Sequence, residues 1–210
     1  MIIDFNAHFG CDPSMPATYS EAELMALLKT AGIDRAVVTK LQRNVSVPFR
    51  GGVRIYPTYA NVGLVDEVLR GLAERTGANI LQVYLRLQDP RVLPQAVSSA
   101  QVIEALDKLA PTHGDTRFVI SGANYAETKA NRGLFTRGNV WTDISHLQHP
   151  INSLPKLLDI VDSSRVLFGS NSPIFYPGMA VFRVIHSPIS DEDRERILWK
   201  NARELLGDVQ

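Results

Sequence analysis

The amino end of the chain carries two polar side chains whose types and spacing suit acid–base or ligand chemistry. Residues 2–8 run Ile-Ile-Asp-Phe-Asn-Ala-His, which is typical of a short buried strand that ends in polar residues. Because side chains alternate between the two faces of a strand, Asn6 and His8 point the same way. An imidazole can transfer a proton or bind a metal ion, and an amide can orient a polar molecule. The pair marks either the start of a site or two hydrogen-bonded structural residues.

Further polar side chains follow the other predicted strands. In parallel α/β folds the functional side chains lie at the carboxyl ends of the strands, where they share one mouth. Besides Asn6 and His8, the candidates at this mouth are Tyr59, Arg86, Ser121, Asp143, His146 and Asn171. His146 and His149 lie three apart, which suits a metal pair, although a solvated loop is the simpler interpretation of that segment.

Seven apolar segments predict the strands that must position these residues. Between them, apolar residues at helical spacing predict helices, and Ser20 with Glu23 forms a capping box before the first helix. The segments 40–52, 88–99 and 173–188 lack a regular pattern, although the last has room for one short helix. The predicted strands are Ile2–Phe5, Ala36–Thr39, Val53–Ala60, Ile80–Leu87, Arg117–Ile120, Asn139–Ile144 and Val166–Gly169.

The alternation of strands and helices predicts an α/β fold with parallel strands, either a barrel or an open doubly wound sheet. No strand is followed by a GxGxxG or GxxxxGK[ST] loop, which disfavours a nucleotide-binding open sheet. The length of 210 residues fits a single domain over residues 1–210.

Composition narrows the range of partners. Lys and Arg number 22 and Asp and Glu number 22, so the net charge is zero and we expect no nucleic-acid or membrane partner. Cys11 is the only cysteine, which excludes an intrachain disulfide and a zinc site built from several thiolates. We see no signal peptide and no apolar run of about 18 residues, so we expect a cytoplasmic protein.

Three segments resemble the amidohydrolase-related family of metal-dependent hydrolases and decarboxylases. The first strand of that family typically ends Asp-x-His-x-His, and this chain has Asp4, Asn6 and His8. Its last strand typically runs Leu-Phe-Gly-Ser-Asp before a proline, which corresponds to Val166–Pro173, and its closing helix corresponds to Lys200–Gly207. The resemblance implies a distorted, shortened TIM-like (β/α) barrel, here with about seven recognisable parallel strands. It also implies a hydrolase or carbon–carbon lyase that uses zinc or another divalent metal.

The departures from the family pattern fall on its metal ligands. The resemblance places Asn6 at the first metal-binding histidine and Asn171 at the terminal aspartate, while Ser121 follows Phe118-Val119-Ile120 where a histidine is typical. A divalent site needs about three or four protein ligands, and an Asn amide is a poor one. Asn171 also cannot accept a proton from a metal-bound water. We therefore expect a degenerate metal site and no metal cofactor. A strand-and-helix unit is missing near residues 88–99.

Three functions remain open. The first is an amidohydrolase-like protein with altered or absent hydrolase activity, in which His8 and Asn171 hold the catalytic positions. Its substrate-binding residues would be Asn6, Tyr59, Arg86, Ser121, Asp143 and His146. The second is a non-catalytic barrel that binds a small polar molecule or forms a homo-oligomer. The third is a hydrolase with a metal site rebuilt from His8, Asp143 and His146.

Overall fold

The computed structural model describes residues 1–10, 18–42, 46–72, 79–150 and 152–207, so Cys11 lies outside the described part. Strands and helices alternate along most of it, as the sequence predicts. The strands are β1 (Ile3–Phe9), β2 (Arg35–Lys40), β3 (Val47–Phe49), β4 (Gly52–Ile55), β5 (Ile80–Tyr84), β6 (Arg117–Ser121), β7 (Val140–Asp143) and β8 (Val166–Leu167). The helices are α1 (Glu21–Thr30), α2 (Gly63–Leu72), α3 (Ser99–Leu109), α4 (Tyr125–Ala130), α5 (Arg132–Phe135), α6 (Ser153–Leu158), α7 (Pro177–Ile185), α8 (Asp191–Glu195) and α9 (Asn201–Leu206).

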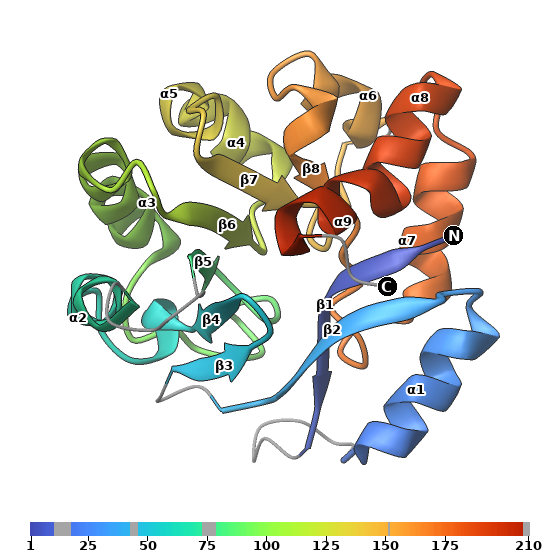
Figure 1. Cartoon of the computed structure of the whole chain (residues 1–210), viewed down its shortest axis with the longest axis horizontal. Helices are drawn as coiled ribbons and strands as arrows, with labels where there is room; N and C mark the ends of the chain where they lie inside the picture. Colours follow the sequence, from blue (N-terminus) through green and yellow to red (C-terminus); the bar gives the residue numbers. More distant parts are fainter. Residues whose placement is uncertain (11–17, 43–45, 73–78, 151, 208–210) are drawn as a thin grey trace.

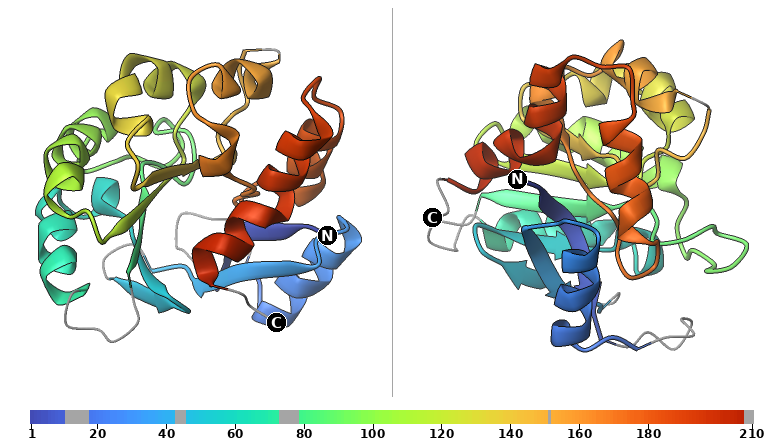
Figure 2. Two further views of the ribbon diagram at one scale, coloured as in Figure 1. Left: turned by 45° about the horizontal axis from the view of Figure 1, so that its top comes forward. Right: turned by 90° about the vertical axis from the view of Figure 1, so that its right-hand side faces the viewer.

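The strands form an arc that is covered on its outside by helices (Figures 1 and 2). One sheet has the order β3-β4-β5-β6-β7-β8, with parallel pairing from β4 onward, and a second sheet pairs β1 with β2 in parallel. The segment after β8 joins the two, because Phe5 N donates to Phe168 O at 2.9 Å and Asn171 N donates to Asn6 O at 2.9 Å. The fold is therefore a shortened, TIM-like α/β barrel, as predicted.

The barrel is not closed by strand pairing between β2 and β4. The short strand β3 pairs antiparallel with β4, and no ladder links either strand to β2 in the described part of the chain. The side chain of Arg54 on β4 spans this gap and is fully buried. Its guanidinium donates to Ala7 O (2.9 Å), Phe5 O (3.1 Å), Val37 O (3.4 Å), Thr39 Oγ1 (2.5 Å) and Gln82 Oε1 (2.7 Å).

A break in the first strand makes this bridge possible. The register between β1 and β2 shifts between Asp4 and Ala7, which takes the Phe5 carbonyl out of the ladder. A buried carbonyl needs a donor, and Arg54 Nη2 supplies one, with Gln82 Nε2 as a second at 3.3 Å. The open side of the barrel is thus joined by side chains rather than by backbone pairing.

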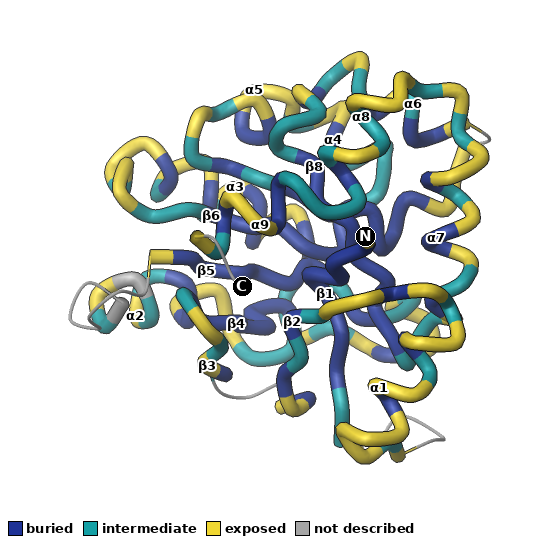
Figure 3. Tube along the Cα trace, turned by 45° about the vertical axis from the view of Figure 1, so that its right-hand side comes forward, coloured by how far each residue is buried: buried dark blue, intermediate teal, exposed yellow. Residues whose placement is uncertain are grey.

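Local signals explain most of the observed elements. The capping box of Ser20 and Glu23 starts α1 as predicted, and Ser98 with Gln101 starts α3 in the same way. The backbone of the central strands is buried, whereas the outer helices are largely exposed on one side (Figure 3). No helix in the described ranges is long and apolar enough to cross a membrane.

The structure also corrects the sequence-based elements in detail. Residues 88–98 contain no strand, which agrees with the prediction that a strand-and-helix unit is missing near residues 88–99. The additional strand is β3, in a segment without a recognisable pattern. Residues 125–135 form two short helices, α4 and α5, and the helix of nine residues α7 lies in segment 173–188, for which one short helix was allowed.

We predict that Arg54→Lys strongly destabilises the protein. A lysine keeps the buried charge but loses the planar fork, so several carbonyl acceptors lose their donor, and we expect a loss of about 3 kcal/mol or more in the free energy of unfolding. Urea denaturation followed by circular dichroism measures it. Arg91→Lys, which changes an exposed ion pair with Asp89, is the matched control and should stay close to the wild type. Equal unfolding midpoints for the two variants would contradict the bridging role.

Candidate functional site

His8 lies at the carboxyl end of β1, where it is fully buried among hydrogen-bonding side chains. Its Nδ1 is 3.2 Å from Arg54 Nη1 and 3.2 Å from Tyr56 Oη, and its Nε2 is 2.8 Å from Tyr84 Oη. A guanidinium can only donate, so Nδ1 must accept the Arg54 hydrogen bond. The proton of the neutral ring then sits on Nε2, which donates to Tyr84.

The electrostatic surroundings keep His8 uncharged. Burial, and then the positive charge of Arg54, hold the pKa of His8 well below its usual range. Burial likewise raises the pKa of Tyr84 well above its usual value. Burial first, and the Arg54 charge second, therefore make the ring a weak proton acceptor near neutral pH.

Asn6 and Asp143 form the second half of the buried polar cluster. Asn6 Nδ2 donates to Asp143 Oδ2 at 2.9 Å, and Ser145 donates to Asp143 Oδ1 through its backbone N (3.0 Å) and its hydroxyl (2.6 Å). Gly169 permits this approach, because a Cβ there would lie 3.0 Å from side-chain atoms of both Asn6 and Asp143. The predicted residues Asn6 and Asp143 are thus brought together.

Asp4, near the start of β1, is another buried polar residue of this strand. Its carboxylate accepts hydrogen bonds from Asn6 N (2.9 Å), Ser170 N (3.0 Å) and the Ser170 hydroxyl. Burial raises the pKa of Asp4 to about 6, although the hydrogen bonds from Ser170 and Asn6 oppose this shift. Asp4 therefore ties β1 to the segment after β8, and it was not among the predicted site residues.

An apolar layer covers the buried cluster. Asn171 is fully buried, has a left-handed backbone conformation (φ 58°), and donates through Nδ2 to Leu87 O at 2.7 Å. The layer consists of the buried residues Leu41, Tyr56, Tyr84, Leu87 and Leu93, with Tyr59 and Ile174 packed against it. The two predicted catalytic positions, His8 and Asn171, consequently have no exposed surface.

Two other predicted site residues lie outside this cluster, along the wall of an open cavity. The cavity has a volume of about 700 Å³ and is lined by Arg86, His146, Phe175 and residues of the neighbouring loops. Arg86 donates to Ser99 Oγ at 3.1 Å and forms an ion pair with Glu127. His146 packs against Phe175, with a distance of 5.0 Å between the ring centroids.

The remaining predicted residues have local partners. Ser121 Oγ accepts a hydrogen bond from Gln82 Nε2 at 2.8 Å, deep in the barrel. Tyr59 Oη accepts one from Leu87 N at 2.9 Å, so this tyrosine holds the loop after β5. The predicted residues therefore divide into a sealed cluster, an open cavity and two positioning contacts rather than converging on one mouth.

The side chain that dominates the site, Arg54, was not predicted from the sequence, and neither was its partner Gln82. A sequence signal does exist, because Arg54 stands in the middle of the apolar segment Gly52–Ile55, all of which is buried. A charged residue inside such a strand needs partners within the barrel. Tyr56, which directly follows β4, was also missed.

A divalent metal site needs about three or four protein ligands. Among the described residues, no three His, Cys, Asp or Glu side chains form a group that could hold one. The alternative site built from His8, Asp143 and His146 is therefore not formed. Both ring nitrogens of His8 already have partners, and one of these partners is a cation. The amide oxygens of Asn6 and Asn171 are buried without a hydrogen-bond partner, but neutral amides are weak ligands.

We predict that His146 contributes to acid destabilisation. Burial, and then the charges of Arg86 and Arg183, lower its pKa to about 3 from 6.5. The folded state thus binds this proton less readily than the unfolded state does. The free energy of unfolding therefore falls as the pH drops below about 6.5, by up to about 1.4 kcal/mol per pH unit. Urea titrations between pH 7 and 4 should give a shallower pH dependence for His146→Gln than for the wild type. His186→Gln is the control for removing an imidazole, and parallel curves for His146→Gln and wild type would contradict the prediction.

Comparison with solved structures shows the same fold in several enzymes. An amidohydrolase II superimposes with a TM-score of 0.71 at 12% identity, over 98% of this chain and 99% of that chain. The 5-carboxyvanillate decarboxylase of Novosphingobium aromaticivorans, complexed with manganese, superimposes with a TM-score of 0.69 at 12% identity, over 98% of this chain and 96% of that chain. The dihydroxybenzoic acid decarboxylase of a Polaromonas species, with bound manganese, superimposes with a TM-score of 0.64 at 11% identity, over 98% of this chain and 96% of that chain.

Sequence comparison finds one relative that matches part of the chain and one family model that matches most of it. A 2-amino-3-carboxymuconate-6-semialdehyde decarboxylase of Caenorhabditis elegans is 35% identical over 71 residues, which are 33% of this chain and 17% of that relative. The amidohydrolase family model matches residues 8–207. Because this match covers nearly the whole sequence, the chain belongs to the amidohydrolase family.

Proposed function

We propose that this chain is an amidohydrolase-family protein in which an internal arginine stands where relatives bind a metal ion. On this proposal it lacks metal-dependent hydrolase or decarboxylase activity. The observation that carries the proposal is the 3.2 Å distance between Arg54 Nη1 and His8 Nδ1, two side chains with no exposed surface. His8 is the one family metal ligand that the resemblance retains.

Electrostatics argues against a metal ion beside this pair. A divalent ion about 5 Å from the guanidinium would be repelled by about 7 kcal/mol at an effective dielectric constant of about 20. A complete structural zinc site has an apparent binding free energy of roughly 10–16 kcal/mol. Repulsion of this size, together with ligands lost at positions 6 and 171, leaves little net affinity.

The two unpartnered amide oxygens support a different occupant of the cluster. Asn6 Oδ1 and Asn171 Oδ1 are both buried, and each is an acceptor that requires a donor. A buried water molecule can donate to such an oxygen, and it adds no positive charge beside Arg54. We propose that water satisfies these oxygens, which is compatible with the neutral state of His8.

The relatives suggest the reaction class from which the chain has departed. Three of them are named as decarboxylases, and two of these structures hold manganese. The sealed position of His8 and Asn171 supports altered or absent activity at the family site rather than a retained decarboxylase. The cytoplasmic location, the self-association and the expected lack of nucleic-acid and membrane partners stay predictions.

We predict that the purified protein binds no stoichiometric metal. After incubation with excess zinc or manganese and desalting, elemental analysis should find well below one ion per chain. A chelator should leave the thermal unfolding midpoint unchanged, because no ion contributes to folding. About one ion per chain that is lost in His8→Gln would contradict the proposal.

The double variant Asn6→His/Asn171→Asp tests whether Arg54 is the decisive residue. It restores the family side chains around His8 but leaves the guanidinium in place. We expect zinc uptake to remain at the wild-type level, measured in the same way, provided that the variant keeps its circular dichroism spectrum. Uptake of one ion per chain in the double variant would show that ligand loss, and not Arg54, excludes the metal.

A further inference from the structure

The outer side of α7 is apolar and exposed to solvent. Tyr176, Met179 and Phe182 are each 60% exposed, and Ile185 is 46% exposed. Because these four residues recur every three positions, they lie along one side of the helix, and we call them the apolar face of α7. The helix runs along the edge of the molecule (Figures 1 and 3). Its opposite side packs into the core through Pro177, Ala180, Val181 and Val184.

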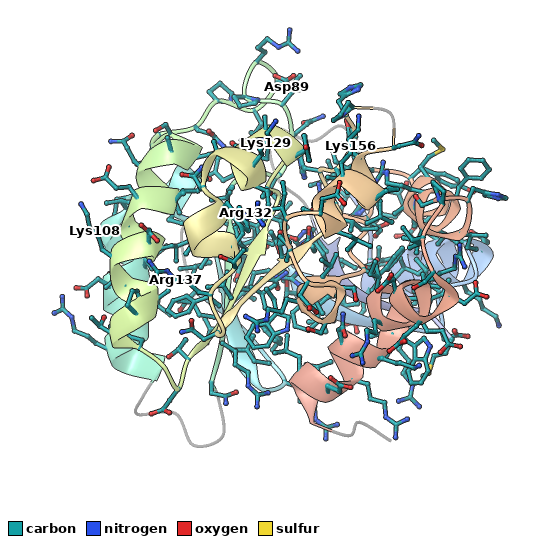
Figure 4. All side chains as sticks on the ribbon, turned by 90° about the horizontal axis from the view of Figure 1, so that it is seen from above. Asp89, Lys108, Lys129, Arg132, Arg137 and Lys156 are labelled. Atoms are coloured by element: carbon teal, nitrogen blue, oxygen red, sulfur yellow. The ribbon has the colours of Figure 1, made fainter. Side chains whose placement is uncertain are left out.

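The outer sides of neighbouring helices carry charges instead. On α3, the exposed residues Glu104 and Lys108 form an ion pair. Figure 4 shows Lys108 on α3 and Lys129 on α4, both on the outside of the molecule. In residues 176–186 the only charged side chain is Arg183, and its Nη1 donates to a backbone carbonyl directly after β7 at 3.2 Å. The apolar face of α7 therefore lacks the charges of a typical solvated helix.

Two aromatic rings of this face are held in place by neighbouring residues. A Cβ on Gly178 would lie 2.7 Å from Tyr176 Cε1, so the tyrosine ring lies over the helix at a residue without a side chain. The ring of Phe182 packs against that of His186, with 4.2 Å between the ring centroids. Rings that are fixed in advance lose little conformational freedom when another surface covers them. The face is therefore pre-organised for a contact.

The order of the side chains favours a second copy of the chain as the partner. In a two-fold symmetric contact of this kind the two helices run antiparallel, so each residue meets the one at the mirrored position. Tyr176 then meets Ile185 of the second copy, and Met179 meets Phe182. Each pair joins an aromatic ring to a flexible or branched aliphatic side chain, and contacts between sulfur and a ring are favourable. The net charge of zero adds no repulsion between copies.

The exposed area of this face suits a weak dimer. An aromatic side chain has an area of about 150–250 Å², so roughly 100 Å² is exposed on each of the four residues. Two copies would bury roughly 800 Å² through these residues, and flanking residues of the paired helices would bring the total to about 1,000 Å². Such an area lies at the low end of specific interfaces, for which we expect a micromolar dissociation constant.

A membrane surface is a poorer match for the same face. Helices that lie in a membrane interface carry Lys and Arg side chains beside their apolar side. Residues 176–186 contain only Arg183, and its guanidinium is already bonded to a backbone carbonyl.

We propose that the apolar face of α7 is the contact surface of a two-fold symmetric dimer of this chain, in which the two α7 helices pack antiparallel. The proposal concerns the outside of the barrel, so it goes beyond the proposed loss of the metal centre and does not depend on it.

Sedimentation velocity of the full chain between about 1 and 200 μM tests the dimer. The mass of the wild type should rise with concentration from that of one chain toward that of two. Phe182→Glu should stay monomeric throughout, because it places a charge in the centre of the contact. Val92→Glu changes a residue that is also 60% exposed but lies outside α7, and it should dimerise like the wild type. A monomeric wild type, or dimers of Phe182→Glu, would overturn the proposal.

A mixing experiment tests the antiparallel pairing. Met179→Lys and Phe182→Glu should each be monomeric alone. In a 1:1 mixture the new ammonium and carboxylate groups face each other, while the second Met179–Phe182 contact stays intact. The mixture should therefore associate at least about tenfold more tightly than the control mixture of Met179→Lys with Ile185→Glu. Equal association in the two mixtures, or none in either, would overturn the pairing.

Vesicles of phosphatidylcholine distinguish a lipid surface from a second copy. The wild type should not sediment with them. Sedimentation of a monomeric wild type that is lost in Phe182→Glu would assign the face to a lipid surface and overturn the dimer. Circular dichroism of each variant confirms that these exposed substitutions leave the fold intact. The metal analysis is a separate measurement, so failure of the metal proposal and failure of this proposal are distinguishable.

Discussion

The rest of the barrel depends on the hydrogen bonds that the buried guanidinium of Arg54 donates. A charge with no exposed surface requires a partner for nearly every N–H, and here the partners come from three strands. These partners include the Phe5 and Ala7 carbonyls, which lie where the register between β1 and β2 shifts. Arg54 therefore connects the irregular part of β1 with the gap beside β2. Arg54 thus replaces, with side-chain hydrogen bonds, the ladder that would otherwise close the barrel.

The same charge shapes the chemistry of the interior. It lies 3.2 Å from His8 Nδ1 and, after burial, is the second cause that lowers the pKa of that ring. The apolar layer above then isolates the cluster from solvent. Beside the cluster lies the open cavity that is lined by Arg86 and His146. It is linked to the interior through His146, Ser145 and Asp143, so the outer cavity and the inner cluster share one hydrogen-bonded chain.

Much of the fold was predictable because its signals are local. Apolar segments, helical spacing and the capping box at Ser20 indicated seven parallel strands and most of the helices, and the resemblance at both ends indicated a shortened barrel. The missed strand β3 has only three residues and is stabilised by pairing with β4, which no local pattern reveals. The helix α7 follows a loop rich in proline and serine, and packing of Val181 and Val184 rather than a cap explains its formation.

The sequence by itself determined the side-chain types at the strand ends, which are an imidazole at His8 and amides at Asn6 and Asn171. Only the tertiary structure decided what these residues do. The contact between Arg54 and His8 joins residues 46 positions apart, and its strength depends on removing both from water. Spacing along a chain cannot report desolvation or distance in space, so the residue that governs the site was visible only as an arginine inside an apolar strand.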